Sequence, residues 1–110
     1  MTETKLALAS LVPYRDYQIA SRSLARRLGI TLPLAVYAMA AGETISTETA
    51  SRTRLLQCLD GVLTVDFTDH STTVESGTLL VIPAGTPHAL RAAQPCKFMQ
   101  IESEERDDLH

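Results

Sequence analysis

The chain has 110 residues, with 10 basic and 13 acidic side chains and a formal net charge of −3, and this length fits one domain. Hydrophobic residues make up 45% and charged residues 21%. This composition argues against a disordered protein, because disordered chains are poorer in aliphatic residues and richer in charge. The longest apolar stretches are too short to span a membrane as a helix. The negative charge and the lack of a basic run argue against nucleic acid as a partner.

The N-terminus and the two cysteines predict the compartment. The first five residues contain no basic segment followed by an apolar one, so we expect no secretion signal. Cys58 and Cys96 lie in separate apolar runs, without a Cys-x-x-Cys pattern and without neighbouring histidines. We therefore expect two buried free thiols in a cytoplasmic protein.

The first quarter of the chain has no clear periodicity. The leucines of residues 1–17 fit either a strand or a short helical turn before Pro13 interrupts the pattern. We expect this segment to be an N-terminal extension, which either covers the β-barrel predicted below or forms an edge strand. Residues 18–28 are rich in Ala, Leu and Arg, which favour a helix, but their pattern does not decide between helix and strand.

From Gly29 onward the sequence predicts short β-strands. Asp60-Gly61 is a turn dipeptide, because glycine adopts a positive φ without steric cost. Strands at this regular spacing are typical of an all-β sandwich or barrel, which we assign to residues 18–103. Residues 104–110 are almost all charged and are predicted to form a solvated tail. The predicted strands are residues 31–41, 53–59, 62–67, 71–75, 79–82, 88–92 and 96–101.

A spaced motif occurs in the second half of the chain. Gly77 is followed after five residues by Pro83, then after one by Gly85 and after two more by His88. This resembles the second motif of the cupin family, except that Ala92 replaces the asparagine of its fullest form. The match implies that these glycines and prolines determine the fold, with Gly85 shaping the turn that aims His88 inward.

The first cupin motif is recognisable only by its outer glycines, Gly42 and Gly61. Together the two motifs extend the resemblance over residues 31–101. It implies a small single-domain cupin, an RmlC-like jelly-roll β-barrel. It also implies that residues 19–28 form the strand that precedes the barrel in small cupins.

The first motif lacks its metal ligands. Where metal-dependent cupins have two histidines and a glutamate, this chain has Glu48, Ala50 and Arg54, so only His88 remains of the four ligands. A transition metal needs three or four converging ligands, and a permanently cationic guanidinium repels a divalent ion. We therefore expect no cofactor. The remaining route to a divalent metal is Glu48 together with His88.

The resemblance implies a pocket bounded by Glu48, Arg54 and His88. His88 either contacts a ligand or is an inward histidine satisfied by Glu48 or a backbone carbonyl. Glu48 and Arg54 either form an ion pair in place of the metal, or Arg54 offers its planar fork to an anionic ligand such as a carboxylate. In a third alternative Arg54 turns outward into water.

Other polar and apolar residues receive ordinary structural roles. Three of them, Arg52, His70 and Arg91, are expected to be solvated surface residues. An apolar stripe is expected to line the barrel interior or the opposite packing surface, and it contains Leu56, Cys58, Phe98 and Met99.

Three function classes follow from the resemblance, because the cupin fold hosts many activities. The lost ligands favour a small-molecule-binding barrel without the metal triad, whose catalytic residues, if any, are unknown. The alternatives are a metal-dependent dioxygenase or isomerase that uses His88 and Glu48, and a ligand-sensing cupin that acts through a partner protein. Because small cupins pair through edge strands, we also expect a homodimer to which the N-terminal strands contribute, and neither a nucleic acid nor a membrane partner.

Overall fold

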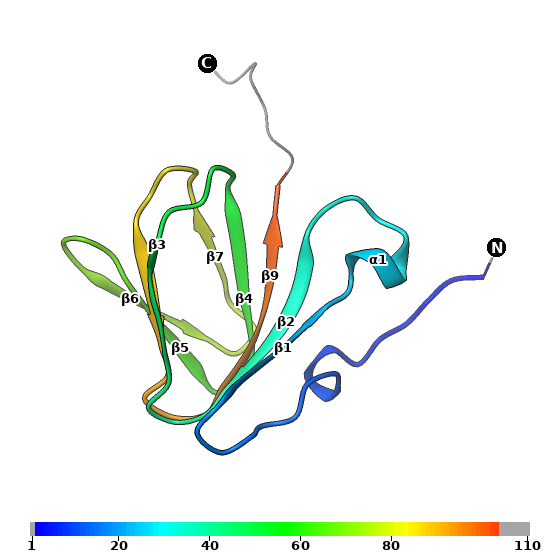
Figure 1. The fold of residues 1–110 in the computed structure, drawn as a ribbon, viewed down its shortest axis with the longest axis horizontal. Coiled ribbons are helices and arrows are strands. Elements are labelled where there is room, and N and C mark those ends of the chain that lie inside the picture. Colours follow the sequence, from blue (N-terminus) through cyan, green and yellow to red (C-terminus); the bar gives the residue numbers. More distant parts are fainter. Residues whose placement is uncertain (1, 104–110) are drawn as a thin grey trace.

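The computed structural model describes residues 2–103 and consists of two antiparallel sheets that enclose a shared core (Figure 1). One sheet has five strands in the order β1-β2-β9-β4-β7, and the other has four in the order β3-β8-β5-β6. This confirms the predicted all-β, single-domain jelly roll. The strands are β1 (Ile19–Ser23), β2 (Leu34–Met39), β3 (Thr44–Glu48), β4 (Arg54–Asp60), β5 (Val62–Asp66), β6 (Ser71–Glu75), β7 (Leu79–Ile82), β8 (His88–Arg91) and β9 (Cys96–Glu102).

Two predictions for single elements are wrong. The sequence analysis did not predict β3, although its Thr44, Ile45 and Thr47 are β-branched residues that favour strands. The strand expected over residues 19–28 ends at Ser23, and a single helical turn follows it, α1 (Ala25–Leu28). Ala, Arg and Leu favour this turn, and Gly29 terminates it in the left-handed conformation, at φ 71°.

Inward-facing side chains from both sheets form the main core. On β9, Cys96 and Phe98 are buried, and on β4 the alternation places Leu56 and Cys58 on the same inner face. Both cysteines are buried and unpaired, as the sequence predicts. The core comprises Met39, Leu56, Cys58, Leu63, Val65, Val74, Ile82, Leu90, Ala92, Cys96 and Phe98.

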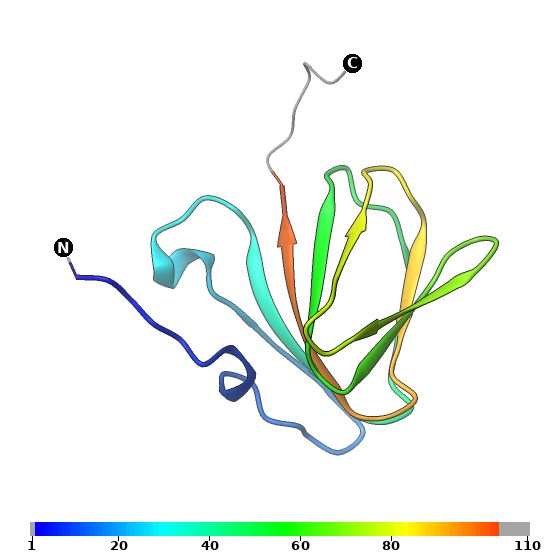
Figure 2. The ribbon, with the colours of Figure 1, turned by 180° about the vertical axis from the view of Figure 1, so that it is seen from behind.

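A second apolar core lies on the outer face of the five-stranded sheet. The N-terminal segment runs along β1 and β2 (Figure 2), and its residues 2–18 contain one turn of 3-10 helix, η1 (Leu8–Ser10), and no strand. Val12 is buried here against the outward side chains of β2, and Met99 of β9 also contacts this cluster. The predicted apolar stripe is therefore divided, with Phe98 facing inward and Met99 outward. Within residues 2–103, no helix is long and apolar enough to cross a bilayer.

The loop between β7 and β8 places His88 at one end of the barrel. Gly85 lies in this loop with φ 81°, a conformation that favours glycine. Its N–H donates a hydrogen bond of 2.9 Å to the carbonyl of Ala50. This bond ties the loop to the connection between β3 and β4, so the two cupin motifs meet at the same end of the barrel.

Candidate functional site

His88 is the only polar residue that is fully buried among residues 2–103, with 1% of its surface exposed. Its Nδ1 lies 2.9 Å from the carbonyl oxygen of Thr86, and its Nε2 lies 3.3 Å from Nη1 of Arg54. A carbonyl can only accept a hydrogen bond and a guanidinium can only donate one. The two contacts therefore specify a neutral imidazole with its proton on Nδ1 and its Nε2 lone pair directed at Arg54.

Arg54 joins the two sheets at this end of the barrel. Its Nε donates to Oε2 of Glu102 over 2.8 Å, and its Nη1 donates to Oε1 of Glu48. Burial opposes the charged form of Arg54, but the hydrogen bonds to Glu102 and Glu48 outweigh it and raise the pKa of the guanidinium. The side chain is 13% exposed. Arg54 is thus a fixed cation that faces inward, which excludes the alternative of an outward side chain.

A β-bulge turns Glu48 toward this cation. In the pairing of β3 with β8, Ile45 lies opposite Leu90 and Glu48 lies opposite His88. Between these two pairs β3 has two residues and β8 has one. The extra residue reverses the alternation of the strand. Ile45 therefore packs against the interior core, while Glu48, at an odd spacing from it, remains exposed but turns to the same side and contacts Arg54.

Glu102 belongs to the site, although the sequence analysis did not predict it. It pairs directly with Arg54 in the register of β9 with β4. The alternation of β9 carries the signal, since Cys96, Phe98 and Glu102 are separated by even numbers of residues and lie on one face. The predicted strand, residues 96–101, is one residue too short at this end.

Tyr37 on β2 is a second residue that the sequence analysis missed. Its ring stacks on Phe98 with a centroid separation of 4.8 Å and an interplanar angle of 9°. Burial raises the pKa of Tyr37, the Arg54 cation opposes this shift, and the carboxylates of Glu48 and Glu102 add to it. The phenol therefore stays protonated near neutral pH and lies within the electrostatic field of the cluster.

The remaining sequence candidates lie outside this cluster. Arg91 pairs with Asp66 at 2.8 Å, and its side chain is 48% exposed. His70 is exposed in the turn between β5 and β6, where Nδ1 lies 2.6 Å from Asp69 and its ring stacks on Phe67. Both are surface residues, as predicted.

The donor set does not fit a bound transition metal. Within the described part of the chain, no three His, Cys, Asp or Glu side chains are close enough to hold one. Instead, the Nε2 of His88 and the carboxylates of Glu48 and Glu102 all contact the guanidinium of Arg54. The cluster consists of two carboxylates, one guanidinium and a neutral imidazole, which leaves a net charge of −1.

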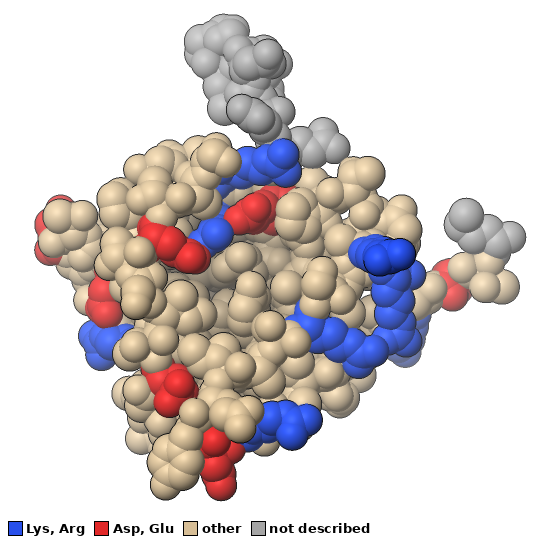
Figure 3. Space-filling view, in the orientation of Figure 1, with Lys and Arg blue, Asp and Glu red and all other residues tan. Residues whose placement is uncertain are grey.

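On the space-filling surface, basic and acidic side chains adjoin at the edge of a hollow (Figure 3).

Comparisons with known proteins agree with the fold. A family model described as a cupin domain matches residues 35–102. A cupin superfamily protein from Desulfitobacterium hafniense is 26% identical, with 96% of this chain and 94% of that chain covered and a TM-score of 0.83. A protein of unknown function from Streptococcus pyogenes is 22% identical, with 96% and 91% covered and a TM-score of 0.84.

A structure of salicylate 1,2-dioxygenase from Pseudoaminobacter salicylatoxidans shares the fold at 19% identity and a TM-score of 0.69, with 76% of this chain and 26% of that chain covered. No curated protein sequence matches the chain significantly. The family model covers more than half of the chain, and it includes both glycine-bounded motifs and the strands that carry the site. The chain therefore belongs to the cupin family.

Proposed function

We propose that this protein is a metal-independent cupin that binds a small molecule at the end of the barrel where His88, Arg54, Glu48 and Glu102 meet. One observation carries the proposal: the guanidinium of Arg54 contacts the Nε2 of His88, at 3.3 Å, and both carboxylates. Arg54 thereby supplies the positive charge that a metal ion would supply, and the acceptors of the cluster are satisfied without one.

The charges of the cluster favour a neutral, hydroxyl-bearing ligand. The net charge of −1 opposes a free anion, which could approach Arg54 only by displacing Glu48, the more exposed of the two carboxylates. Within residues 2–103, Nη2 of Arg54 makes no hydrogen bond and can donate two. Hydroxyl groups can accept from Nη2 and donate to the carboxylates, and the phenol of Tyr37 adds a further donor and acceptor.

The metal-dependent alternative is not supported, because His88 directs its Nε2 at a cation and, within residues 2–103, no three His, Cys, Asp or Glu side chains are grouped so that they could hold a metal. For assembly we propose a homodimer. Strand β1 is an edge of the five-stranded sheet, and its free edge can pair with another strand. Light scattering at micromolar concentration tests this proposal, and a monomer would contradict it.

A binding screen tests the proposed site. The panel contains neutral sugars and polyols alongside small carboxylates, and the readouts are the melting temperature and calorimetric titration of each hit. We expect a neutral hydroxylated compound to stabilise the wild type and to lose at least tenfold in affinity in Arg54→Lys, which keeps the charge and removes the fork. Arg91→Lys is the matched control and should bind as the wild type does. Hits confined to carboxylates, or equal binding by Arg54→Lys, would contradict the proposed chemistry.

A further inference from the structure

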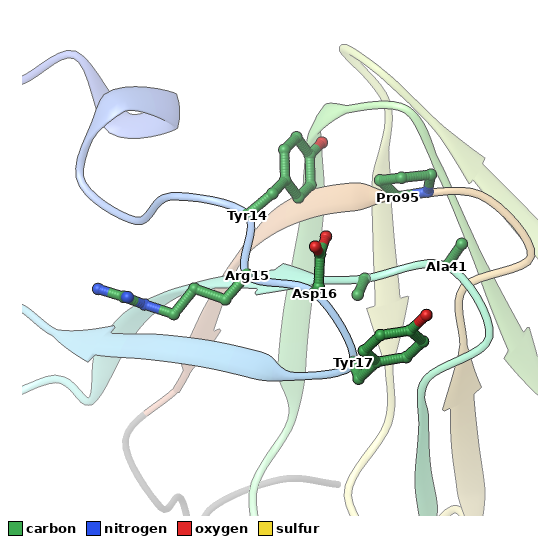
Figure 4. Close-up of a pocket in the computed structure, with 7 residues that line it drawn as sticks. Tyr14, Arg15, Asp16, Tyr17, Ala41 and Pro95 are labelled. Atoms are coloured by element: carbon green, nitrogen blue, oxygen red, sulfur yellow. The ribbon is translucent and has the colours of Figure 1, made fainter.

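A second cavity lies at the opposite end of the barrel. Its volume is about 290 Å³, and it is lined by Tyr14, Arg15, Asp16, Tyr17, Ala40, Ala41 and Pro95 (Figure 4). Pro95 immediately precedes β9, whereas Glu102 ends that strand. The cavity is therefore separated from the Arg54 cluster by the length of β9, and an inference about it does not rest on the proposed function.

Tyr17 has an unusual backbone and an unusual exposure. Its φ is 59°, and among the residues that the structure describes it is the only non-glycine with a positive φ. Tyr17 is also a large hydrophobic residue that lies on the surface, with 88% of its residue surface exposed. A bulky residue is disfavoured in the left-handed region, and here its ring gains no burial in return. Strain of this kind is characteristic of functional positions.

Tyr14 lines the cavity and is positioned by two contacts. Its hydroxyl donates to the carboxylate of Asp60, and the ammonium of Lys97 lies 4.7 Å from the centre of its ring. Lys97 also donates to the carbonyl of Ala9 over 2.6 Å. Burial, together with the hydrogen bond to Asp60, raises the pKa of Tyr14. Asp60 and Lys97 thus both contact Tyr14, and neither is among the residues that line the cavity.

Asp16 is the charged group that faces the space between the two tyrosines. Figure 4 shows its carboxylate between the side chains of Tyr14 and Tyr17, while Arg15 extends away from them. Within residues 2–103, Asp16 makes no salt bridge. A free carboxylate beside an exposed aromatic face is the combination that recognises an organic cation, through charge and through attraction to the ring.

We propose that this cavity binds a small organic cation of the alkylammonium class, with Asp16 as its counter-ion and the ring of Tyr17 as its aromatic contact. The alanine and proline of the lining contact the alkyl groups. The strained backbone of Tyr17 orients its ring toward the ligand, so the positive φ contributes to binding.

Titration with tetramethylammonium chloride, followed by the backbone amide signals in solution NMR, tests this proposal. We expect saturable shifts at Asp16 and Tyr17 that sodium chloride at equal ionic strength does not produce. The neutral isostere tert-butanol should bind at least tenfold more weakly, as should Asp16→Asn exposed to tetramethylammonium. Asp69→Asn removes an exposed carboxylate outside the cavity, so it is the matched control and should bind as the wild type does. Equal binding of tert-butanol, or the absence of saturable shifts at these residues, overturns the proposal.

A second variant keeps the test independent of folding. Tyr17→Gly relieves the positive φ, so its melting temperature should equal or exceed that of the wild type, while its affinity for tetramethylammonium should fall at least tenfold. A Tyr17→Gly protein that is folded and still binds the cation with unchanged affinity contradicts the role of the ring.

Discussion

Arg54 of β4 reaches across the barrel to His88 of β8, and its Nη1 lies 3.3 Å from the Nε2 of the imidazole. The contact joins the five-stranded sheet to the four-stranded sheet at the end where the two cupin motifs meet. In this contact the guanidinium can only donate a hydrogen bond, so the Nε2 of His88 is the acceptor. In the proposed function, this fixed cation takes the electrostatic role of a metal ion.

The first prediction concerns the stability that Arg54 provides. Arg54→Leu leaves two carboxylates and the imidazole without their shared donor, and we expect a loss of about 2 kcal/mol in the free energy of unfolding. Arg91→Leu removes an arginine from an exposed pair with Asp66 and should cost less than about 1 kcal/mol. Urea denaturation of the three proteins measures the difference. Equal losses in both variants would show that Arg54 is an ordinary surface ion pair.

The second prediction concerns metal content. Since the donors of the cluster are directed at Arg54, the purified, untagged protein should contain far less than one transition metal ion per chain in elemental analysis. His88→Ala is the control and should leave the measured content unchanged. A near-stoichiometric metal that disappears in His88→Ala would refute the metal-independent site and redirect the search to oxygenase and isomerase substrates.

The features predicted from the sequence have local causes. Turn residues such as Gly85 act through their own backbone geometry, so the loop that aims His88 is visible in the spacing of Gly77, Pro83 and His88. The alternation within single strands likewise identifies most of the β-structure. The family resemblance and the loss of its metal ligands can therefore be recognised from the amino-acid sequence alone.

The features that were missed or left open depend on pairing between distant segments. The partner of Arg54 is decided by the register of β4 with β9, which places Arg54 opposite Glu102. The direction of Glu48 depends on a bulge against β8, and a bulge shifts a strand by one residue without a clear mark in the sequence. The alternation of β4 and of β9 can place Arg54 and Glu102 on the inner face, but the contact between them does not follow from the spacing along either strand alone.

The third prediction concerns the pH dependence of stability. Burial, followed by the neighbouring Cys58 and Asp60, raises the pKa of the Cys96 thiol to about 12. The unfolded chain has an ordinary thiol, so above pH 9 it loses a proton that the folded protein keeps, and stability falls as pH rises through the window from about 9 to about 12. Between pH 8 and pH 10 this single group should remove about 1 kcal/mol.

Cys96→Ala isolates this effect, because every other titrating group is shared with the wild type. The stability advantage of the wild type over Cys96→Ala should shrink between pH 8 and pH 10 in urea denaturation. A constant difference across this range would mean that the thiol ionises equally well in the folded protein.

The last prediction compares two glycines with the same backbone preference and different surroundings. Gly61 and Gly85 have φ of 73° and 81°, so alanine is strained at both positions and should cost about 1 kcal/mol for this reason alone. A Cβ at Gly61 would lie 2.4 Å from the carbonyl oxygen of Pro95, whereas at Gly85 it would meet nothing within 4 Å. The turn after β4 can relieve this overlap only by moving away from the start of β9, so Gly61→Ala should lose about 3 kcal/mol. Thermal and urea denaturation of both variants measure the gap, and equal losses would show that the close approach of Gly61 to Pro95 is not required for the fold.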